Sequence, residues 1–365
     1  MVKETEKDEL TPLLKGTVVR AGGGLYEVDV QGDEPAHHDE SQRPLAEQTT
    51  TAQDAGEQQD SQPVGANELM LCTLRGLLKR GKRVTAQPVS VGDSVLVRPL
   101  ETFGPDARGR RLREGHIEEV LPRRTLLGRS RYNKTDQVTV ANLDQVVVVL
   151  SVREPELNTH RLDRFLVLIE ASDLQAIICF NKCDLLRKRE FKAEVEPLLS
   201  LYRGLGYVTI GTSEETGLGI AELRAQLQNH ISAFIGSSGV GKSSLANAVQ
   251  PGLHLWVGDV MDIGKGRHTT TEVSLHPLAG GGYIADTPGV KTVSLLEQED
   301  VNLPQCFPEF QPFLSACRFN DCSHVHEPGC AVREAVENGE IAASRYESYR
   351  KILDDMATKG RKIFA

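Results

Sequence analysis

The sequence has no long apolar run, and its 365 residues include one tryptophan and only 5% aromatic residues. No stretch approaches the roughly 20 apolar residues that a membrane-spanning helix needs, so we expect no membrane partner. The first residues are charged and lack the apolar segment of a secretory signal, which predicts a cytoplasmic protein. Seven cysteines, an odd number, argue against a disulfide framework and favour a reducing compartment.

Charge is unevenly distributed along the chain, although its formal net charge is −9. Residues 31–70 contain nine acidic residues and one basic residue, whereas residues 71–134 contain fifteen basic and six acidic residues. A local basic segment can neutralise phosphates whatever the sign of the whole molecule, so this one indicates a nucleic-acid partner. A solvated run of charges is the alternative. The leading candidates for RNA contact are Arg75, Lys79, Arg80, Lys82 and Arg83.

The pattern of apolar residues divides the chain into segments of different kinds. Residues 14–125 have the alternation and the Gly/Pro punctuation of a small β-barrel, after a flexible N-terminus at residues 1–13. Residues 31–67 have few large apolar side chains, which predicts a disordered acidic insertion. In residues 126–295 apolar strands alternate with amphipathic helices, a pattern typical of an α/β fold with a buried parallel sheet. Residues 296–365 hold a Cys/His cluster and end in one or two helices that we expect to be exposed.

A phosphate-binding loop is the clearest motif of the central segment. Gly236–Ser243 fits the pattern G-x-x-x-x-G-K-S between an apolar strand and an apolar-periodic helix. In such a loop backbone N–H groups point at phosphate oxygens, at a helix N-terminus that favours anions. We expect Lys242 to reach the β- and γ-phosphates and Ser243 to bind Mg²⁺. The predicted phosphate-binding residues are Gly236, Ser237, Ser238, Gly239, Val240, Gly241, Lys242, Ser243 and Ser244.

A guanine-reading motif precedes the phosphate loop in the sequence. Asn181, Lys182, Cys183 and Asp184 follow an apolar strand, and a carboxylate at Asp184 accepts hydrogen bonds from guanine that adenine cannot donate. We expect Lys182 to lie along the base and Asn181 to tie this loop to the phosphate loop. Thr212 and Ser213, after the next predicted strand, are a weaker match to residues that lie behind the base.

Two further segments are predicted to sense the γ-phosphate. Asp286 ends a strand in Asp-Thr-Pro-Gly, so we expect it in the Mg²⁺ shell and the Gly289 amide near the γ-phosphate. The glycine-rich segment before it contains consecutive threonines, of which either Thr269 or Thr270 could offer a hydroxyl to Mg²⁺.

The position that Ras-type enzymes fill with a water-orienting glutamine is Val290 in this sequence. An apolar side chain cannot orient water, so the basal rate of hydrolysis should be low. His268 is the nearest candidate for that role, and a histidine that caps a turn is the alternative. The predicted catalytic residues are therefore Lys242, His268, Thr269 and Thr270.

A metal site is predicted near the C-terminus. Cys317, Cys322, His324 and Cys330 offer three sulfurs and one nitrogen, a closed tetrahedral set for structural Zn²⁺. His326 is a rival ligand, and buried cysteines without a metal are the alternative. The remaining cysteines are expected to be ordinary buried or loop thiols, namely Cys72, Cys179, Cys183 and Cys306.

The order of these motifs, with the guanine-reading motif before the phosphate loop, resembles the order found in a circularly permuted GTPase. With the barrel and the cysteine cluster, the chain resembles the ribosome small subunit-dependent GTPase A family from about Leu14 onward, the acidic insertion excepted. The resemblance implies an OB-fold barrel, a permuted, doubly wound GTPase domain and a zinc-binding helical domain. It also implies Zn²⁺ and Mg²⁺ as cofactors, the small (30S) ribosomal subunit and its rRNA as partners, and catalysis by His268.

Two functions follow from these observations. The first is a monomeric GTP hydrolase that acts in late maturation of the small subunit, with GTP and GDP timing its binding and release. The second is a nucleotide-gated rRNA-binding scaffold with incidental turnover, which Val290 favours and the intact Lys242, Ser243 and Asp286 disfavour. An ATP-driven enzyme is disfavoured by Asp184. Because the segment after Gly289 leads into the cysteine cluster, we also expect GTP to reposition the C-terminal tail.

Overall fold

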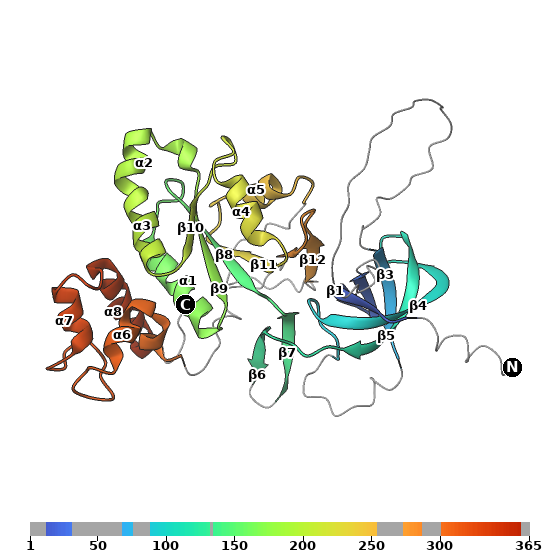
Figure 1. The fold of residues 1–365 in the computed structure, drawn as a ribbon, viewed down its shortest axis with the longest axis horizontal. Coiled ribbons are helices and arrows are strands. Elements are labelled where there is room, and N and C mark those ends of the chain that lie inside the picture. Colours follow the sequence, from blue (N-terminus) through green and yellow to red (C-terminus); the bar gives the residue numbers. More distant parts are fainter. Residues whose placement is uncertain are drawn as a thin grey trace, which may run out of the picture.

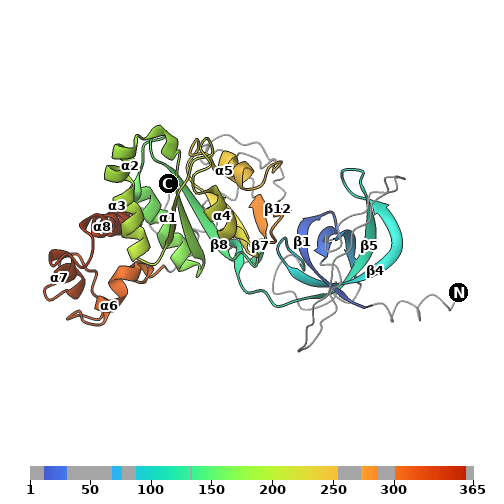
Figure 2. The ribbon, with the colours of Figure 1, turned by 45° about the horizontal axis from the view of Figure 1, so that its top comes forward.

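The structure, a computed structural model, places a barrel and a helical tail at opposite ends of a central α/β domain (Figures 1 and 2). The whole of the predicted acidic insertion, and residues 1–11 of the predicted flexible N-terminus, lie outside the residues that it describes. No helix in the described part of the chain is long and apolar enough to span a bilayer. The described residues are 12–30, 68–75, 88–131, 134–253, 273–286 and 301–358.

Five strands form the barrel, in the order β1-β2-β3-β5-β4. Strand β1 also pairs with β4, which closes the sheet, and β3 runs parallel to β5. Alternate side chains point inward, and the interior is filled by residues such as Val97 and Ile117. This closed five-stranded arrangement confirms the predicted OB-fold. The strands are β1 (Leu14–Gly22), β2 (Leu25–Val30), β3 (Glu68–Leu74), β4 (Ser94–Pro105) and β5 (Arg111–Val120).

A separate hairpin leads from the barrel into the central domain. It consists of β6 (Leu126–Arg131) and β7 (Lys134–Ala141), which pair only with each other among the described strands. At its end Asn142 donates from Nδ2 to the Gly92 carbonyl at 2.9 Å and accepts the Arg124 N–H at 2.8 Å. The hairpin is thereby fixed to a barrel loop.

The central sheet, in the order β10-β9-β8-β11-β13-β12, is parallel apart from β12, which also pairs with β1 of the barrel through Ser274 and Arg20. Strand β8 is buried along its whole length, as its continuous apolar sequence predicts. The strands are β8 (Gln145–Ser151), β9 (Gln175–Asn181), β10 (Val208–Gly211), β11 (Ile231–Ile235), β12 (Ser274–Pro277) and β13 (Tyr283–Asp286), with β12 antiparallel to β13.

Helices cover both faces of this sheet because successive side chains of a strand point to opposite faces. Val146 and Val148 pack in one apolar cluster with α1 and α3, whereas Val147 and Val149 pack in another with α4 and α5. Residues 190–206 have the apolar pattern of a single helix but form parts of two. The reason is Pro197, which cannot continue a helix but suits the first turn of a new one. The helices are α1 (Thr159–Ala171), α2 (Lys188–Glu194), α3 (Glu196–Gly204), α4 (Ile220–Leu227) and α5 (Lys242–Val249).

The C-terminal tail packs on α1, so the prediction of exposed final helices is wrong. The Arg345 side chain is only 1% exposed, and its guanidinium lies 2.5 Å from Asp163 of α1 and 2.6 Å from Glu309. Tyr349 and Ile352 of the same helix are buried in the core of the tail. Besides short 3₁₀ turns, the tail contains α6 (Gln311–Leu314), α7 (Ala331–Glu337) and α8 (Ala343–Thr358).

We predict that Arg345→Ala lowers the free energy of unfolding by about 3–5 kcal/mol, because it leaves two carboxylates buried without a counter-ion. The matched control is Glu347→Gln, which breaks an exposed pair with Lys351 and should cost less than about 1 kcal/mol. Urea unfolding of the full chain measures both. Equal losses in the two variants would show that the buried cluster does not hold the tail.

Candidate nucleotide-binding site

The phosphate loop connects β11 to α5 and approaches its neighbours so closely that glycine is required at two positions. A Cβ atom on Gly236 would lie 2.3 Å from the Val149 carbonyl oxygen. One on Gly241 would lie 2.5 Å from Asn181 Nδ2, and Gly241 also has a φ of 93°. The pattern of glycines therefore follows from contact with β8 and with the base-reading loop.

The side chain of Lys242 folds back onto the start of the phosphate loop. Lys242 Nζ donates to the carbonyl oxygens of Gly236 and Ser237, at 3.0 and 2.9 Å. Ser243 and Ser244 follow in the first turn of α5, where backbone N–H groups have no partner within the helix. The loop thus combines a positive side chain with a helix N-terminus, the arrangement that binds phosphate.

The base-reading loop is joined directly to the phosphate loop by Asn181. Its Nδ2 donates to the Val240 carbonyl at 2.9 Å, and its Oδ1 accepts the Thr212 hydroxyl at 3.0 Å. Asp184 is exposed and accepts the Ser213 hydroxyl at 2.6 Å. Residues after β9, β10 and β11 therefore meet at one edge of the sheet, where parallel strands bind ligands.

Cys183 lies within the base-reading loop but is a structural residue. Its side chain is buried and donates to the Phe180 carbonyl at 3.0 Å. Burial raises the pKa of the Cys183 thiol to about 11, so the reactive thiolate does not form at neutral pH. Cys72, Cys179 and Cys306 are buried as well, as predicted.

Two contacts at this edge could not be predicted from the sequence. Lys182 Nζ donates to the Glu154 carbonyl, and Arg161 donates to the Ser237 hydroxyl of the phosphate loop at 2.6 Å. The first contact links the segment between β8 and α1 to the base-reading loop, and the second links α1 to the phosphate loop. Neither Glu154 nor Arg161 belongs to a recognisable motif, because their role depends on a segment that is distant in sequence from the phosphate loop.

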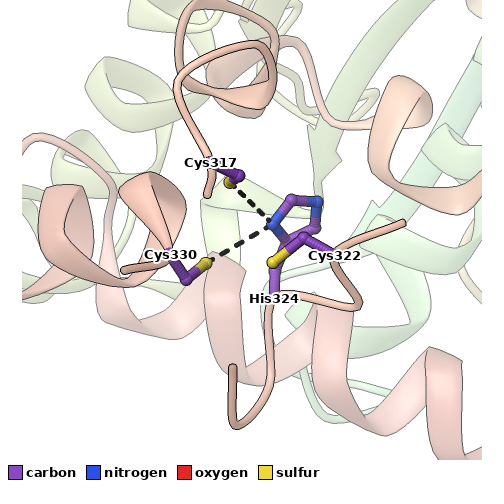
Figure 3. A group of neighbouring side chains, drawn as sticks. All are labelled: Cys317, Cys322, His324 and Cys330. Atoms are coloured by element: carbon purple, nitrogen blue, oxygen red, sulfur yellow. Dashed lines mark hydrogen bonds between the residues drawn. The ribbon is translucent and has the colours of Figure 1, made fainter. Parts of the chain in front are cut away.

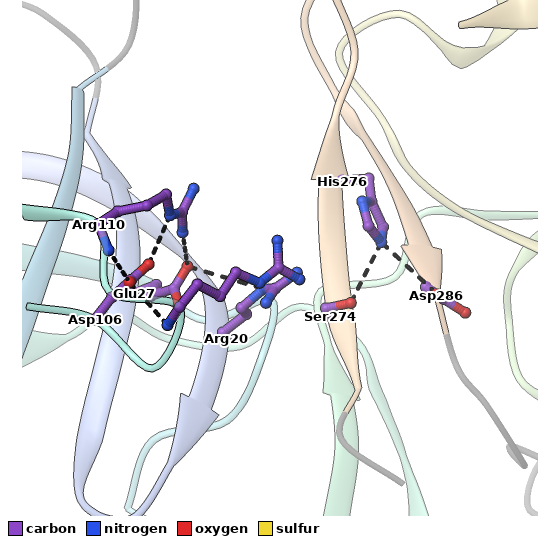
Figure 4. A network of polar contacts seen from close by, with 8 residues as sticks. Arg20, Glu27, Asp106, Arg110, Ser274, His276 and Asp286 are labelled. Atoms are coloured by element: carbon purple, nitrogen blue, oxygen red, sulfur yellow. Dashed lines mark hydrogen bonds and ion pairs between the residues drawn. The ribbon is translucent and has the colours of Figure 1, made fainter. Parts of the chain in front are cut away.

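Asp286 ends β13, next to the barrel. Figure 4 shows His276, on the neighbouring strand, with Nε2 3.7 Å from the Asp286 carboxylate and 3.4 Å from the Ser274 hydroxyl. On the same hairpin Tyr283 donates to Asp29 of the barrel at 2.7 Å. The hairpin that carries Asp286 is therefore also a contact surface for the barrel.

The residues expected to complete the catalytic centre lie outside the described part of the chain. They are His268, Thr269, Thr270 and Gly289, and Val290 lies outside it as well. Four of the five basic candidates for RNA contact, Lys79, Arg80, Lys82 and Arg83, also lie outside it. The fifth, Arg75, is half-exposed, and its Nη1 donates to both carboxylate oxygens of Glu118, at 2.7 and 2.8 Å. Arg98 shares this carboxylate at 3.0 Å, so Glu118 offsets only part of the charge of the two arginines.

The four predicted metal ligands lie together in the tail (Figure 3). The ligand atoms of Cys317, Cys322, His324 and Cys330 all lie within 4.8 Å of one another, and His326 is not part of the group. His324 Nδ1 is 3.5 Å from the sulfurs of both Cys317 and Cys330. Tetrahedral Zn²⁺, with bonds of about 2.3 Å to sulfur and 2.05 Å to nitrogen, requires about 3.6 Å between them. The group therefore fits zinc.

Hydrogen bonds from the surrounding residues hold this group in shape. The Tyr346 hydroxyl donates to the His324 carbonyl at 2.7 Å, and the Tyr349 hydroxyl donates to the Ser323 carbonyl at 2.8 Å. Glu327 accepts both the N–H and the hydroxyl of Ser323, and these bonds hold its pKa well below the usual range. Burial lowers the pKa of His324, which favours the neutral imidazole that binds a metal.

Comparison with known proteins identifies the family. The sequence model of the RsgA GTPase family matches residues 120–296. The small ribosomal subunit biogenesis GTPase RsgA of Gemmatimonas aurantiaca is 44% identical over 294 residues, which are 79% of this chain and 91% of the relative. The chain belongs to the RsgA GTPase family. The small ribosomal subunit biogenesis GTPase RsgA of Thermotoga maritima is 42% identical, over 81% of this chain and 92% of the relative.

Two solved structures share the fold. The crystal structure of YjeQ from Thermotoga maritima matches 95% of this chain and 99% of its own, with a TM-score of 0.64 and 35% identity. YloQ, described as a circularly permuted GTPase, matches 95% of this chain and 96% of its own, with a TM-score of 0.65 and 28% identity. The predicted family, permuted fold and GTPase class are confirmed.

We predict that Asp184→Asn weakens GTP binding about 10- to 100-fold and improves binding of XTP. The variant loses a charged acceptor for guanine and gains an amide donor that suits the xanthine carbonyl. Fluorescence titration with both nucleotides measures the change, and Glu222→Gln, which removes an exposed charge from α4, should bind GTP like the wild type. GTP affinity at the wild-type level in Asp184→Asn, with no gain for XTP, would refute the assignment.

We also predict one zinc per chain after purification without chelator, and its loss in Cys322→Ser. Because the binding free energy goes into local folding, the variant's tail should become sensitive to protease while GTP binding persists. His326→Ala is the matched control and should keep its zinc. A wild-type protein that carries no zinc would remove this prediction.

Proposed function

We propose that this chain is a GTP hydrolase whose nucleotide state times its binding to, and release from, the small ribosomal subunit during late maturation. The nucleotide part of the proposal is supported by one observation: Asn181 contacts both the phosphate loop and Thr212. The ribosomal part is supported by relatives named small ribosomal subunit biogenesis GTPase. On this proposal the protein acts as a monomer in the cytoplasm.

Different residues of the site bind the base, the phosphates and the Mg²⁺ of the nucleotide. Asp184 reads the guanine edge, with Ser213 holding its carboxylate in place. Lys242 contacts the β- and γ-phosphates, together with the backbone N–H groups of the phosphate loop. Ser243, Asp286 and one threonine, Thr269 or Thr270, hold Mg²⁺, which neutralises charge that develops on the phosphates.

Hydrolysis needs a group that positions the attacking water, and Val290 cannot supply one. We assign this role to His268, in the segment that precedes β12. Binding to the subunit brings His268 to the attacking water, so that hydrolysis, slow in the free protein, becomes faster on the subunit. The four-ligand group of the tail holds one structural Zn²⁺, which keeps the tail folded.

A nucleotide-gated scaffold with incidental turnover is the second candidate, and Val290 is the residue that favours it. In that case GTP would set the affinity for the subunit, and the rate of hydrolysis would not change on binding. The two functions therefore differ in one measurable property, which is stimulation of turnover by small subunits.

We predict that small subunits strongly stimulate multiple-turnover phosphate release, and that His268→Ala lowers the stimulated rate about 100-fold or more. GTP-dependent binding to the subunit should persist in this variant, and His326→Ala should be stimulated like the wild type. Wild-type rates that are equal with and without subunits would favour the scaffold. Full stimulation of His268→Ala would show that another group positions the water.

A further inference from the structure

Two phenylalanines are exposed among the residues that the structure describes, and each lies beneath an arginine. Phe103 of the barrel is 54% exposed, with the Arg111 guanidinium carbon 5.8 Å from its ring centroid. Phe319 of the tail is 41% exposed, with the corresponding carbon of Arg318 at 5.6 Å. The same pairing of ring and cation therefore occurs twice, in unrelated parts of the fold.

A rigid hairpin presents the barrel pair. Phe103 of β4 is paired with Arg113 of β5, so Arg111, two residues away, projects from the same face. Arg113 donates to the Leu100 carbonyl at 2.9 Å, and this bond joins the two strands of the hairpin next to Phe103. Asp106 accepts two backbone N–H groups in the turn, at 2.9 and 2.7 Å. The ring is thus held in place while it remains exposed.

The metal group presents the tail pair. Arg318 and Phe319 lie between two of its ligands, Cys317 and Cys322. The Arg318 N–H donates to the Gly329 carbonyl at 3.0 Å, and a Cβ atom on Gly329 would lie 3.2 Å from that of Arg318. The loop between Cys317 and Cys322 is therefore held at both ends by the metal group and at Arg318 by this hydrogen bond. Little conformational entropy is lost when the Phe319 ring binds a partner.

Nucleic acid is the kind of partner that fits these two sites. Unpaired bases stack on aromatic rings and guanidinium planes, and a neighbouring cation attracts the phosphate backbone. The relatives' name, small ribosomal subunit biogenesis GTPase, favours RNA over a protein groove as that partner. The barrel and the tail, which carry these two sites, lie at opposite ends of the molecule in both views, so a partner that contacts both must extend across it (Figures 1 and 2).

We propose that Phe103 and Phe319 each stack an unpaired base of ribosomal RNA when the protein binds the small subunit, with Arg111 and Arg318 on the other face of each ring. The proposal rests on the proposed function, which it extends by naming the contact residues. It differs from the basic candidates around Lys79 in its chemistry, because stacking contributes affinity without neutralising phosphates.

Affinity for small subunits, measured with a non-hydrolysable GTP analogue at several salt concentrations, gives the first test. We expect Phe103→Ala and Phe319→Ala each to bind about tenfold more weakly, and the double variant about a hundredfold, with an unchanged salt dependence. Leu25→Ala and Leu218→Ala remove exposed side chains without a ring and should stay within about twofold of wild type. Zinc content and GTP affinity, unchanged in all variants, show that folding is intact.

Fluorescence gives the second test, in a Trp256→Phe background that removes the chain's one tryptophan. Phe103→Trp and Phe319→Trp should keep their affinity for subunits, and a 20-nucleotide single-stranded RNA should quench their emission through stacking. Quenching without any binding of the wild type to subunits would support the stacking sites but contradict the proposed function. Alanine variants that bind subunits like the wild type, or weaker binding without quenching by RNA, would overturn the proposal.

Discussion

The side chain of Asn181 holds the nucleotide site together. This side chain is 3% exposed. Its amide group donates a hydrogen bond to Val240 of the phosphate loop and accepts one from Thr212 of the loop after β10. A buried amide is costly to leave without partners, so these bonds fix the distance between the base reader and the phosphate loop. The permuted order does not disturb this contact, because β8, β9, β10 and β11 are still neighbours in one parallel sheet.

Much of this arrangement could be predicted, because it depends on patterns that are local in sequence. The continuous apolar run of β8, the glycines of the phosphate loop and the spacing of Cys317 to Cys330 each indicate their structure directly. Spacing alone does not choose between His324 and His326, and the position of their ring nitrogens decides for His324. The break between α2 and α3 is not evident from the apolar pattern, because that pattern continues through Pro197.

The burial of Arg345 could not be predicted, because an arginine in a helix is normally exposed. Its partners are 182 residues away, in α1, and 36 residues away, in the tail. This cluster also changes the expected mechanism. Movement of the tail relative to α1 would separate buried charges at a cost of several kcal/mol. The tail is therefore expected to move together with α1, which contacts the phosphate loop through Arg161.

Nucleotide-dependent binding to the small subunit is the central claim, and co-sedimentation with purified subunits tests it most directly. The wild-type chain, at one protein and salt concentration, is mixed with subunits in a non-hydrolysable GTP analogue or in GDP. The account predicts that the protein pellets with subunits in the analogue and remains in the supernatant in GDP. Equal amounts in the pellet with both nucleotides would contradict it.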